Sequence, residues 1–407
     1  MEKNKNLINI IITLKKLKRS TLKKFSERIS MELKTLFSSG KIGNIQIKNR
    51  IVRSATWEAR ATEDGHITDE LINFYEELAN GGSGLLITGF SAVHPSGAAT
   101  RCMNCIYDDS YILGHKKLVS KVHDISDVKI SVQIVHTGSR FYTDKCEPIG
   151  PSPLTDPVSK KTARELSLIE IEEIIESFAE AGRRAYESEY DMVQLHAAHG
   201  FLLSDFISPF SNKRKDEYGG NTQSRVKIIL EIFNRIRDKV GKNFPIIIKL
   251  NTIDYVKNGL TIDDGKEIAK MLVNTGFAAI EPSCGRIDIQ ISKGKTYPSV
   301  IVKSEEDENY FLPNAKLIKS ITKDCPIILM GGVRNPNIAE DFLKKGIVDF
   351  ISMSRPLIYE PDLPNRWKNG DLSLPLCNYC SACLGTGLRG PVHCIVRKKL
   401  EKKKQKK

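Results

Sequence analysis

The chain has 407 residues and 40% of them are hydrophobic, which is enough to bury the core of one large domain or two ordinary ones. The net charge of +13 is confined to the ends, because residues 1–30 and residues 397–407 each carry +7 and the remainder sums to −1. A nearly neutral body argues against a protein built around nucleic acid, so we expect no specific nucleic-acid partner. Weak attraction of the basic tails to RNA or anionic membrane is the alternative.

Neither targeting nor membrane insertion is indicated. No apolar run reaches the roughly 18 residues that a membrane span needs, and the short apolar stretch 7–14 has no cleavage site after it. Four of the nine cysteines fall between positions 377 and 394, which favours a reducing compartment and a metal site over disulfides. We expect a cytoplasmic protein with a basic, disordered extension over 1–30, a folded domain over 31–370, a cysteine-rich segment over 371–396 and a basic tail over 397–407.

Short apolar strands and amphipathic helices alternate along the folded part. We expect strands at 49–55, 84–89, 129–136, 192–197, 245–250, 278–282, 326–330 and 350–353. We expect helices at 69–79, 111–125, 166–189, 222–240, 261–274, 313–322, 336–345 and 363–368. The segment 138–162 is rich in proline, glycine and serine and too long for an ordinary connection, which indicates a lid over a site.

The fold class follows from the composition of these strands. Continuous runs of Ile, Val and Leu, without alternation, are typical of strands that are buried on both faces. Eight strand–helix units of this kind predict a (β/α)8 TIM barrel of the α/β class. A doubly wound open sheet is the alternative, but it would normally carry a glycine-rich phosphate turn after the first strand, where this chain has Ser54, Ala55, Thr56 and Trp57.

Polar residues stand at the carboxyl ends of the predicted strands, where the active site of a barrel lies. His196 and His199 follow the fourth strand, and two imidazoles so spaced can hydrogen-bond one anionic or carbonyl oxygen together. Half of a metal site and a structural histidine pair are the alternatives. Gln133 lies in the third strand and Lys249 in the fifth, where a buried cation requires a partner.

A phosphate site is indicated late in the chain. Gly331 and Gly332 end the seventh strand just before a helix, so backbone N–H groups and a helix amino end can approach an anion there. Ser354 and Arg355 follow the eighth strand and add a hydroxyl and a guanidinium. An ordinary tight turn is the alternative for the glycine pair, although the loops after strands seven and eight are the usual phosphate site of a barrel. A phosphate site together with the buried Lys249 favours FMN, whose ring becomes anionic on reduction and would be the partner of that cation.

From about residue 35 to 370 the chain resembles the Old Yellow Enzyme family of flavin-dependent barrel oxidoreductases. The matching stretches are residues 48–55, Gln133 with 136–138, the block 196–225, residues 331–332 and residues 354–356. The block 196–225, which begins with His-Ala-Ala-His-Gly, is the most specific of these.

The resemblance implies a role for each matching residue. FMN would be bound through the backbone of Ala55 and Thr56, at the pyrimidine edge by Gln133, near N1 and O2 by Lys249, and at the phosphate by Gly331, Gly332, Ser354 and Arg355. His196 and His199 would be catalytic, because they would hold the carbonyl or nitro oxygen of the substrate and polarise it for hydride delivery. Many family members place a proton-donating tyrosine where this chain has Phe201, so Tyr142 in the expected lid, or water, would be the acid.

Cys377, Cys380, Cys383 and Cys394 form a compact set of thiols after the barrel. Thiolates at such spacing suit a [4Fe–4S] cluster or structural zinc, and a set without metal is the third interpretation. The run is similar to one in the family branch of dienoyl-CoA reductases and trimethylamine dehydrogenase, which binds [4Fe–4S] next to the flavin. Members of that branch continue into further nucleotide-binding domains.

The sequence therefore predicts an NAD(P)H:flavin oxidoreductase that moves hydride from NADH or NADPH through FMN to an activated alkene or related small electrophile. Its partners would be a nicotinamide and a small-molecule substrate, with association between copies left open. A dehydrogenase that passes electrons from substrate through flavin to a [4Fe–4S] cluster is the second hypothesis. A non-catalytic barrel whose basic tails bind RNA or membrane is the third.

Overall fold

The computed structural model describes residues 33–98, 100–125, 127–140, 146–292 and 298–404. The fold below belongs to the compact unit that begins at Thr35. The predicted extension over 1–30 and the predicted acid Tyr142 lie outside the described residues. No helix in the described part of the chain combines the length and the apolarity that crossing a bilayer requires.

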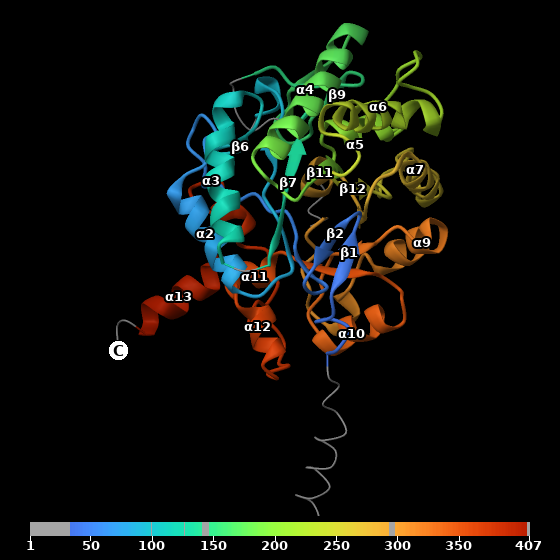
Figure 1. Ribbon diagram of the computed structural model, residues 1–407. Helices are drawn as coiled ribbons and strands as arrows, with labels where there is room; N and C mark the ends of the chain where they lie inside the picture. Colours follow the sequence, from blue (N-terminus) through green and yellow to red (C-terminus); the bar gives the residue numbers. More distant parts are fainter. Residues whose placement is uncertain (1–32, 99, 126, 141–145, 293–297, 405–407) are drawn as a thin grey trace, which may run out of the picture. The chain divides into compact units, whose positions relative to one another are not determined.

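Eight parallel strands form the centre of this unit (Figure 1). They are β3 (Ile51–Arg53), β4 (Leu85–Ile87), β7 (Lys129–Val135), β11 (Met192–Ala197), β12 (Ile246–Asn251), β13 (Ile280–Ser283), β14 (Ile328–Leu329) and β15 (Phe350–Met353). Neighbours in the sheet follow the order of the chain, and β15 pairs in parallel with both β14 and β3. A parallel bridge between Ile280 and Ile327 joins the two ends of this path, so the sheet closes. The predicted TIM barrel is confirmed.

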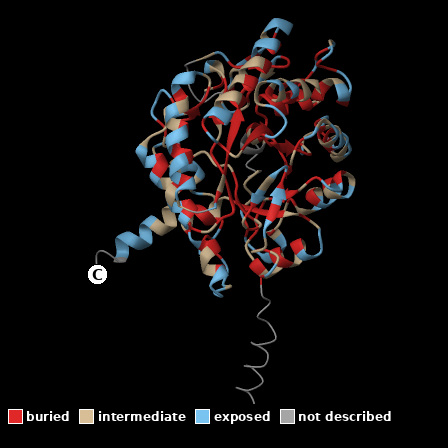
Figure 2. Cartoon of the chain, viewed as in Figure 1, coloured by how far each residue is buried: buried red, intermediate tan, exposed pale blue. Residues whose placement is uncertain are grey.

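The strands are buried on both faces, as their continuous apolar runs predict, and Figure 2 shows them buried among helices whose outer faces are exposed. An antiparallel hairpin, β1 (Gly40–Ile42) and β2 (Ile45–Ile47), places Ile42 and Ile47 in one cluster with residues of seven strands or their amino ends. The hairpin therefore closes the amino end of the barrel. The carboxyl ends remain for the site.

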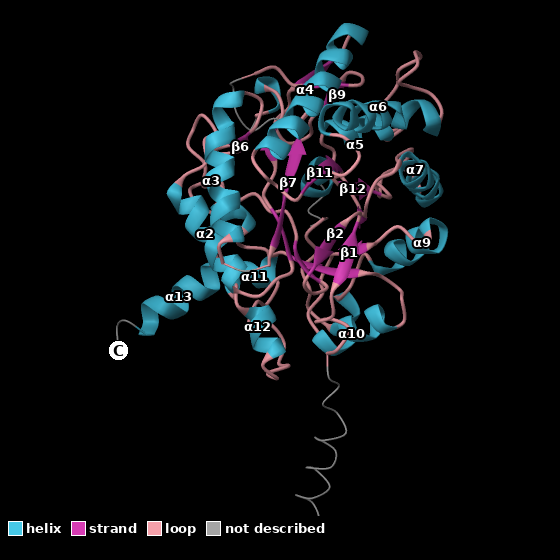
Figure 3. Ribbon diagram, viewed as in Figure 1, coloured by secondary structure: helices cyan, strands magenta, loops and turns pink. Residues whose placement is uncertain are grey.

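Helices surround the strands (Figure 3). Those that match the predicted ones are α2 (Asp69–Asn80), α3 (Ile112–His123), α4 (Leu168–Glu187), α6 (Thr222–Val240), α7 (Ile262–Thr275), α9 (Leu312–Thr322), α10 (Pro336–Lys344) and α12 (Leu363–Lys368). Four further helices were not expected: α5 (Leu202–Ile207), α8 (Ile287–Ser292), α11 (Arg355–Tyr359) and α13 (Ile395–Lys404). Helix α13 includes residues 397–404 of the predicted basic tail.

The segment 138–162 contains regular structure that its composition did not indicate. Strands β8 (Ile149–Gly150), β9 (Leu154–Thr155) and β10 (Thr162–Glu165) form a small sheet with β10 in the middle. Buried Arg214 donates to the carbonyl oxygens of Pro151 (3.1 Å) and Leu166 (2.6 Å), which ties this sheet to the loop after α5. The described part of the segment is therefore a packed element beside the barrel end.

Candidate functional site

A layer of polar side chains fills the barrel interior near the carboxyl ends of its strands. Lys249 of β12 and Glu281 of β13 are neighbours in register and form a buried ion pair, with 2.8 Å between Nζ and Oε2. Glu281 also accepts hydrogen bonds from Ser54 Oγ (2.8 Å), Ser352 Oγ (2.9 Å) and Gln194 Nε2 (3.0 Å). Burial would raise the pKa of Glu281, but Lys249 and these hydrogen bonds hold it below its usual value. The partner of Lys249 is thus a carboxylate that the sequence analysis did not identify.

His196 and His199 lie at the end of β11, beside this layer. His196 is buried and stands opposite Lys249 in register. The two imidazole rings are 5.1 Å apart between centroids and nearly perpendicular, at 88°. His199 hydrogen-bonds through Nε2 to Ser283 Oγ at 2.7 Å, whereas the buried Nδ1 of His196 has no hydrogen-bond partner among the described residues. The pair therefore presents an unsatisfied polar atom beside the end of a strand.

Both imidazoles are neutral. Burial, together with the Lys249 cation, lowers the pKa of His199 to about 3. Burial lowers the pKa of His196 well below its usual value, and the neighbouring His199 and Lys249 lower it further. A neutral imidazole offers one N–H donor, so the pair can hydrogen-bond a substrate oxygen without adding a charge to the site.

A buried charge cluster supports the turn that carries His199. His199 has a φ of +68°, a left-handed conformation that is uncommon outside glycine. The next residue, Gly200, accepts a hydrogen bond from Arg140 Nε at 2.9 Å. Arg140 and Arg286 are both fully buried, and both form ion pairs with Asp288. This cluster holds the backbone that orients the second imidazole.

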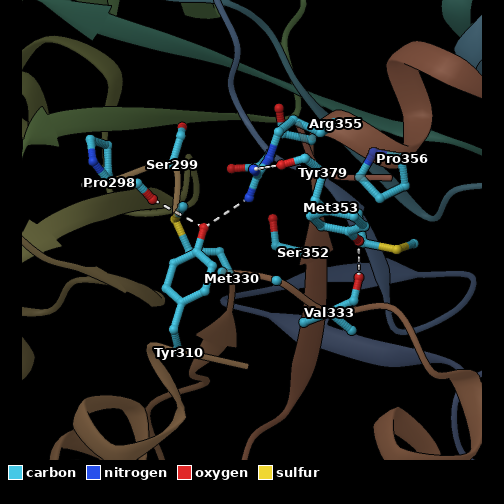
Figure 4. Close-up of a pocket in the computed structure, with 14 residues that line it drawn as sticks. Pro298, Ser299, Tyr310, Met330, Val333, Ser352, Met353, Arg355, Pro356 and Tyr379 are labelled. Carbon is cyan, nitrogen blue, oxygen red and sulfur yellow. Dashed lines mark hydrogen bonds between the residues drawn. The ribbon is translucent and has the colours of Figure 1, made fainter. Parts of the chain in front are cut away.

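A second part of the site is a pocket beside β14 and β15 (Figure 4). Gly331 (φ +102°) and Gly332 (φ +77°) contribute left-handed backbone to it, and a Cβ on either would come within 2.9 Å of the Tyr310 ring. Arg355 donates to the carbonyl oxygen of Val300 at 2.8 Å and stacks on the Tyr379 ring, with 4.8 Å from Cζ to the centroid. The pocket thus combines two glycines, a guanidinium and aromatic walls.

The pocket and the histidine pair lie on the same rim of the barrel. Ser54 and Met330 line the pocket, and both contact Lys249 Nζ, at 3.1 Å to Oγ and 3.2 Å to Sδ. Ser354 lines it as well and hydrogen-bonds Thr56 at 2.7 Å. Lys249, which stands opposite His196 in the sheet, therefore connects the pocket with the imidazoles.

Most of the predicted site residues are brought together. Those on this rim or in the polar layer are Thr56, Gln133, His196, His199, Lys249, Gly331, Gly332, Ser354 and Arg355. Ala55 is half-buried and packs against the core cluster. Sequence reasoning missed Gln194, Glu281, Ser283, Tyr310 and Tyr379. Glu281 had a detectable signal, because it is a charged residue inside a predicted buried strand one unit after Lys249.

The cysteine-rich segment packs against the barrel without forming a recognisable metal site. Across the described residues, no three or more His, Cys, Asp or Glu side chains are grouped so that they could hold a metal ion. Cys383 and Cys394 nevertheless belong to one apolar cluster, and Cys377 packs with Tyr379. Burial raises the pKa of Cys377 to about 11, and Cys383 and Cys394 add to the increase. Burial also raises the pKa of Cys383, and Cys394 and the exposed Cys380 add to that increase, so all four thiols lie near one another.

Comparison with known proteins agrees with the family resemblance found in the sequence. Residues 35–372 match the model of the NADH:flavin oxidoreductase / NADH oxidase family. An NADH oxidase of Thermoanaerobacter brockii is 35% identical over 356 residues, which cover 86% of this chain and 53% of the relative. An NADPH dehydrogenase of a Geobacillus species is 31% identical over 333 residues, which cover 81% of this chain and 92% of the relative. The chain thus spans about half the length of some curated relatives and nearly all of others.

Solved structures agree with the fold. A 2-naphthoyl-CoA reductase in complex with 2-naphthoyl-CoA superposes with a TM-score of 0.82 at 26% identity, covering 89% of this chain and 57% of that one. An Old Yellow Enzyme homologue from Zymomonas mobilis superposes with a TM-score of 0.71 at 25% identity, covering 85% of this chain and 96% of that one. With the closed barrel and the rim described above, these matches show that the chain belongs to the NADH:flavin oxidoreductase family, the family of Old Yellow Enzyme.

Proposed function

We propose that this protein is an FMN-dependent oxidoreductase that uses NADH or NADPH to reduce an activated alkene or a related small electrophile. The observation that carries the proposal is the neutral imidazole pair, with the unpaired Nδ1 of His196, on one rim with a buried lysine and a glycine-lined pocket. A site of this kind suits a phosphate-bearing cofactor whose phosphate lies in the pocket, with the oxygen of a separate substrate at the imidazole pair.

The residues present fit FMN. Gly331 and Gly332 line the pocket with backbone that a phosphate would meet, and Ser354 with Arg355 would complete its binding. Gln133 would meet the pyrimidine edge of the ring and Lys249 its N1 side. When bound, the flavin supplies a ring that takes hydride from the nicotinamide and delivers it to the substrate.

The two histidines would bind and polarise the substrate oxygen. Because both rings are neutral, they would stabilise the negative charge that develops on that oxygen by hydrogen bonding. The ring of Phe201 lies 4.8 Å from His196 and that of Phe90 lies 5.7 Å from Phe201, so an apolar wall adjoins the oxygen site. This wall favours a flat, apolar substrate and provides no proton. We therefore propose Tyr142 or a water molecule as the acid.

A second candidate function is a dehydrogenase that passes electrons from its substrate through the flavin to a [4Fe–4S] cluster held by Cys377, Cys380, Cys383 and Cys394. Two links through Arg53 favour it. Arg53 donates to Thr56 Oγ1 at 2.9 Å. Burial lowers the pKa of Arg53, and the Cys383 thiol is near enough to oppose that effect. The cysteine-rich segment thus comes close to the loop that would touch the flavin. Iron quantified per chain after anaerobic purification separates the two functions.

The double variant His196→Ala/His199→Ala tests the first proposal. We expect it to retain FMN, but to lose turnover and the long-wavelength charge-transfer absorption that a phenol bound over the flavin produces. His123→Ala is the matched control, because His123 is an exposed histidine that pairs with Asp191 outside the site, and the variant should behave as the wild type. Unchanged turnover in the double variant would contradict the proposed binding of the substrate oxygen.

A further inference from the structure

Three buried side chains on β7, β11 and β13 form a chain of directed hydrogen bonds that passes over β12. Glu281 of β13 accepts from Gln194 Nε2 at 3.0 Å, and Gln194 of β11 in turn accepts through Oε1 from Gln133 Nε2 at 2.7 Å. Gln194 and Gln133 face each other in register across β11 and β7.

The direction of this chain is set at its carboxylate end. Glu281 is ionised beside Lys249, and an ionised carboxylate can only accept hydrogen bonds. Gln194 must therefore turn its NH2 group toward Glu281 and its oxygen toward Gln133. A reversed amide would place two acceptors against each other in a buried layer, which is costly. Gln133 then donates one N–H to Gln194, and its own Oε1 can accept a hydrogen bond from a ligand.

We propose that Glu281 is a positioning residue that acts through Gln194 to fix Gln133 with its amide oxygen toward the cofactor. The site then selects a ring whose edge carries an N–H donor, which in a flavin is the unsubstituted N3–H. This inference rests on the proposed function, because it assumes that Gln133 meets the pyrimidine edge of FMN. It adds a specificity determinant behind the groups that would touch the flavin.

The same carboxylate also balances the charge of Lys249. With Glu281 in place, the pair contributes no net charge beneath the proposed ring. Removal of the carboxylate charge would leave the lysine unbalanced, and an unbalanced cation stabilises the anionic reduced flavin. Glu281 therefore has two separable effects. Through Gln194 it fixes the orientation of the Gln133 amide, and through Lys249 it influences the midpoint potential of the bound flavin.

The test compares binding of FMN and of 3-methyl-FMN, which lacks the N3–H, to flavin-depleted protein by quenching of flavin fluorescence. We expect the wild type to prefer FMN by about tenfold or more, because the methylated ring leaves the Gln133 oxygen unpaired. In Gln194→Met, which keeps the length of the side chain but not its hydrogen bonds, Gln133 is free to turn, and the preference should fall to about twofold. The midpoint potential of bound FMN should stay near the wild-type value in this variant.

Glu281→Gln should lose the preference as well and, unlike Gln194→Met, should raise the midpoint potential. Ser131→Ala is the control, because Ser131 is buried on β7 two residues before Gln133 and its hydroxyl has no hydrogen-bond partner among the described residues. If Glu281→Gln does not fold, Gln194→Met alone decides. An undiminished preference for FMN in Gln194→Met would overturn the inference, whereas a wild type that binds no FMN would overturn the proposed function itself.

Discussion

The barrel rim and the cysteine-rich segment carry chemistry in two different ways. On the rim, parallel strands in register bring Lys249 to Glu281 and His196 to Lys249, so the backbone ladder fixes the geometry before any ligand binds. The cysteine-rich segment has one short 3-10 helix, η4 (Leu384–Thr386), before α13, and within it Cys380 is exposed whereas Cys377 is buried. The comparison teaches that the proposed flavin site would be built by the fold, whereas a cluster site would have to be completed by its metal.

The sharpest way to break this comparison is to disrupt the preformed layer. Lys249→Met would leave Glu281 buried without its cation, so we expect the free energy of unfolding to fall by about 3–5 kcal/mol, as measured by urea denaturation. Lys249→Met/Glu281→Gln, which removes both charges, should lose clearly less. A single variant within about 1 kcal/mol of the wild type would show that the ion pair does not support the rim.

A smaller effect is expected from the glycine that lines the pocket. Gly332→Ala places a Cβ 2.9 Å from the Tyr310 ring at a φ of +77°, and we expect FMN affinity to fall at least about tenfold. Gly346→Ala is the matched control, because Gly346 also has a positive φ, +64°, but has open space around it. Both variants should lose stability through backbone strain, Gly332→Ala the more because the Tyr310 ring must also move, and only Gly332→Ala should lose flavin. Equal flavin binding in the two variants would contradict the proposal that this pocket binds FMN.

In the cysteine-rich segment we expect a substitution to change metal binding and to leave the stability of the barrel nearly unchanged. Cys383→Ser should abolish iron binding after anaerobic purification, while the free energy of unfolding of the barrel changes by less than about 1 kcal/mol. Cys102→Ser, at a thiol outside the set, should leave the iron content as in the wild type. Wild-type protein without iron would favour the interpretation of the four cysteines as a set without this metal.

The smallest expected effect is an absence of titration. The pKa of His199 lies at about 3, so binding of a neutral carbonyl ligand should be constant between pH 5 and 8, measured by flavin absorbance. The lowered pKa of His199 also makes the stability of the fold depend on pH. In the unfolded chain this histidine protonates near its usual value of 6.5, so its contribution to the free energy of unfolding is complete above that pH and is lost as the pH falls toward 3. A change in ligand affinity centred near pH 6.5 would show that the imidazoles are not neutral in the site.

Much of the fold was predictable because its signals are local. Eight buried strands follow from continuous apolar runs, and α12 lies where the sequence places it, at residues 363–368. The small sheet β8–β10 was not predictable, because two-residue strands have too short a pattern. Of the site, the histidines and glycines stand in recognisable motifs, whereas Glu281 and Gln194 depend on which strands become neighbours in space.

The central claim is that one rim of the barrel binds FMN beside a neutral imidazole pair. The most direct measurement is to titrate flavin-depleted protein with FMN, quantify the bound flavin per chain, and then add a phenol while recording the absorption spectrum. The account predicts about one FMN per chain and a new long-wavelength band on phenol addition. Protein that retains no FMN, or that retains it without any spectral response to the phenol, would contradict it.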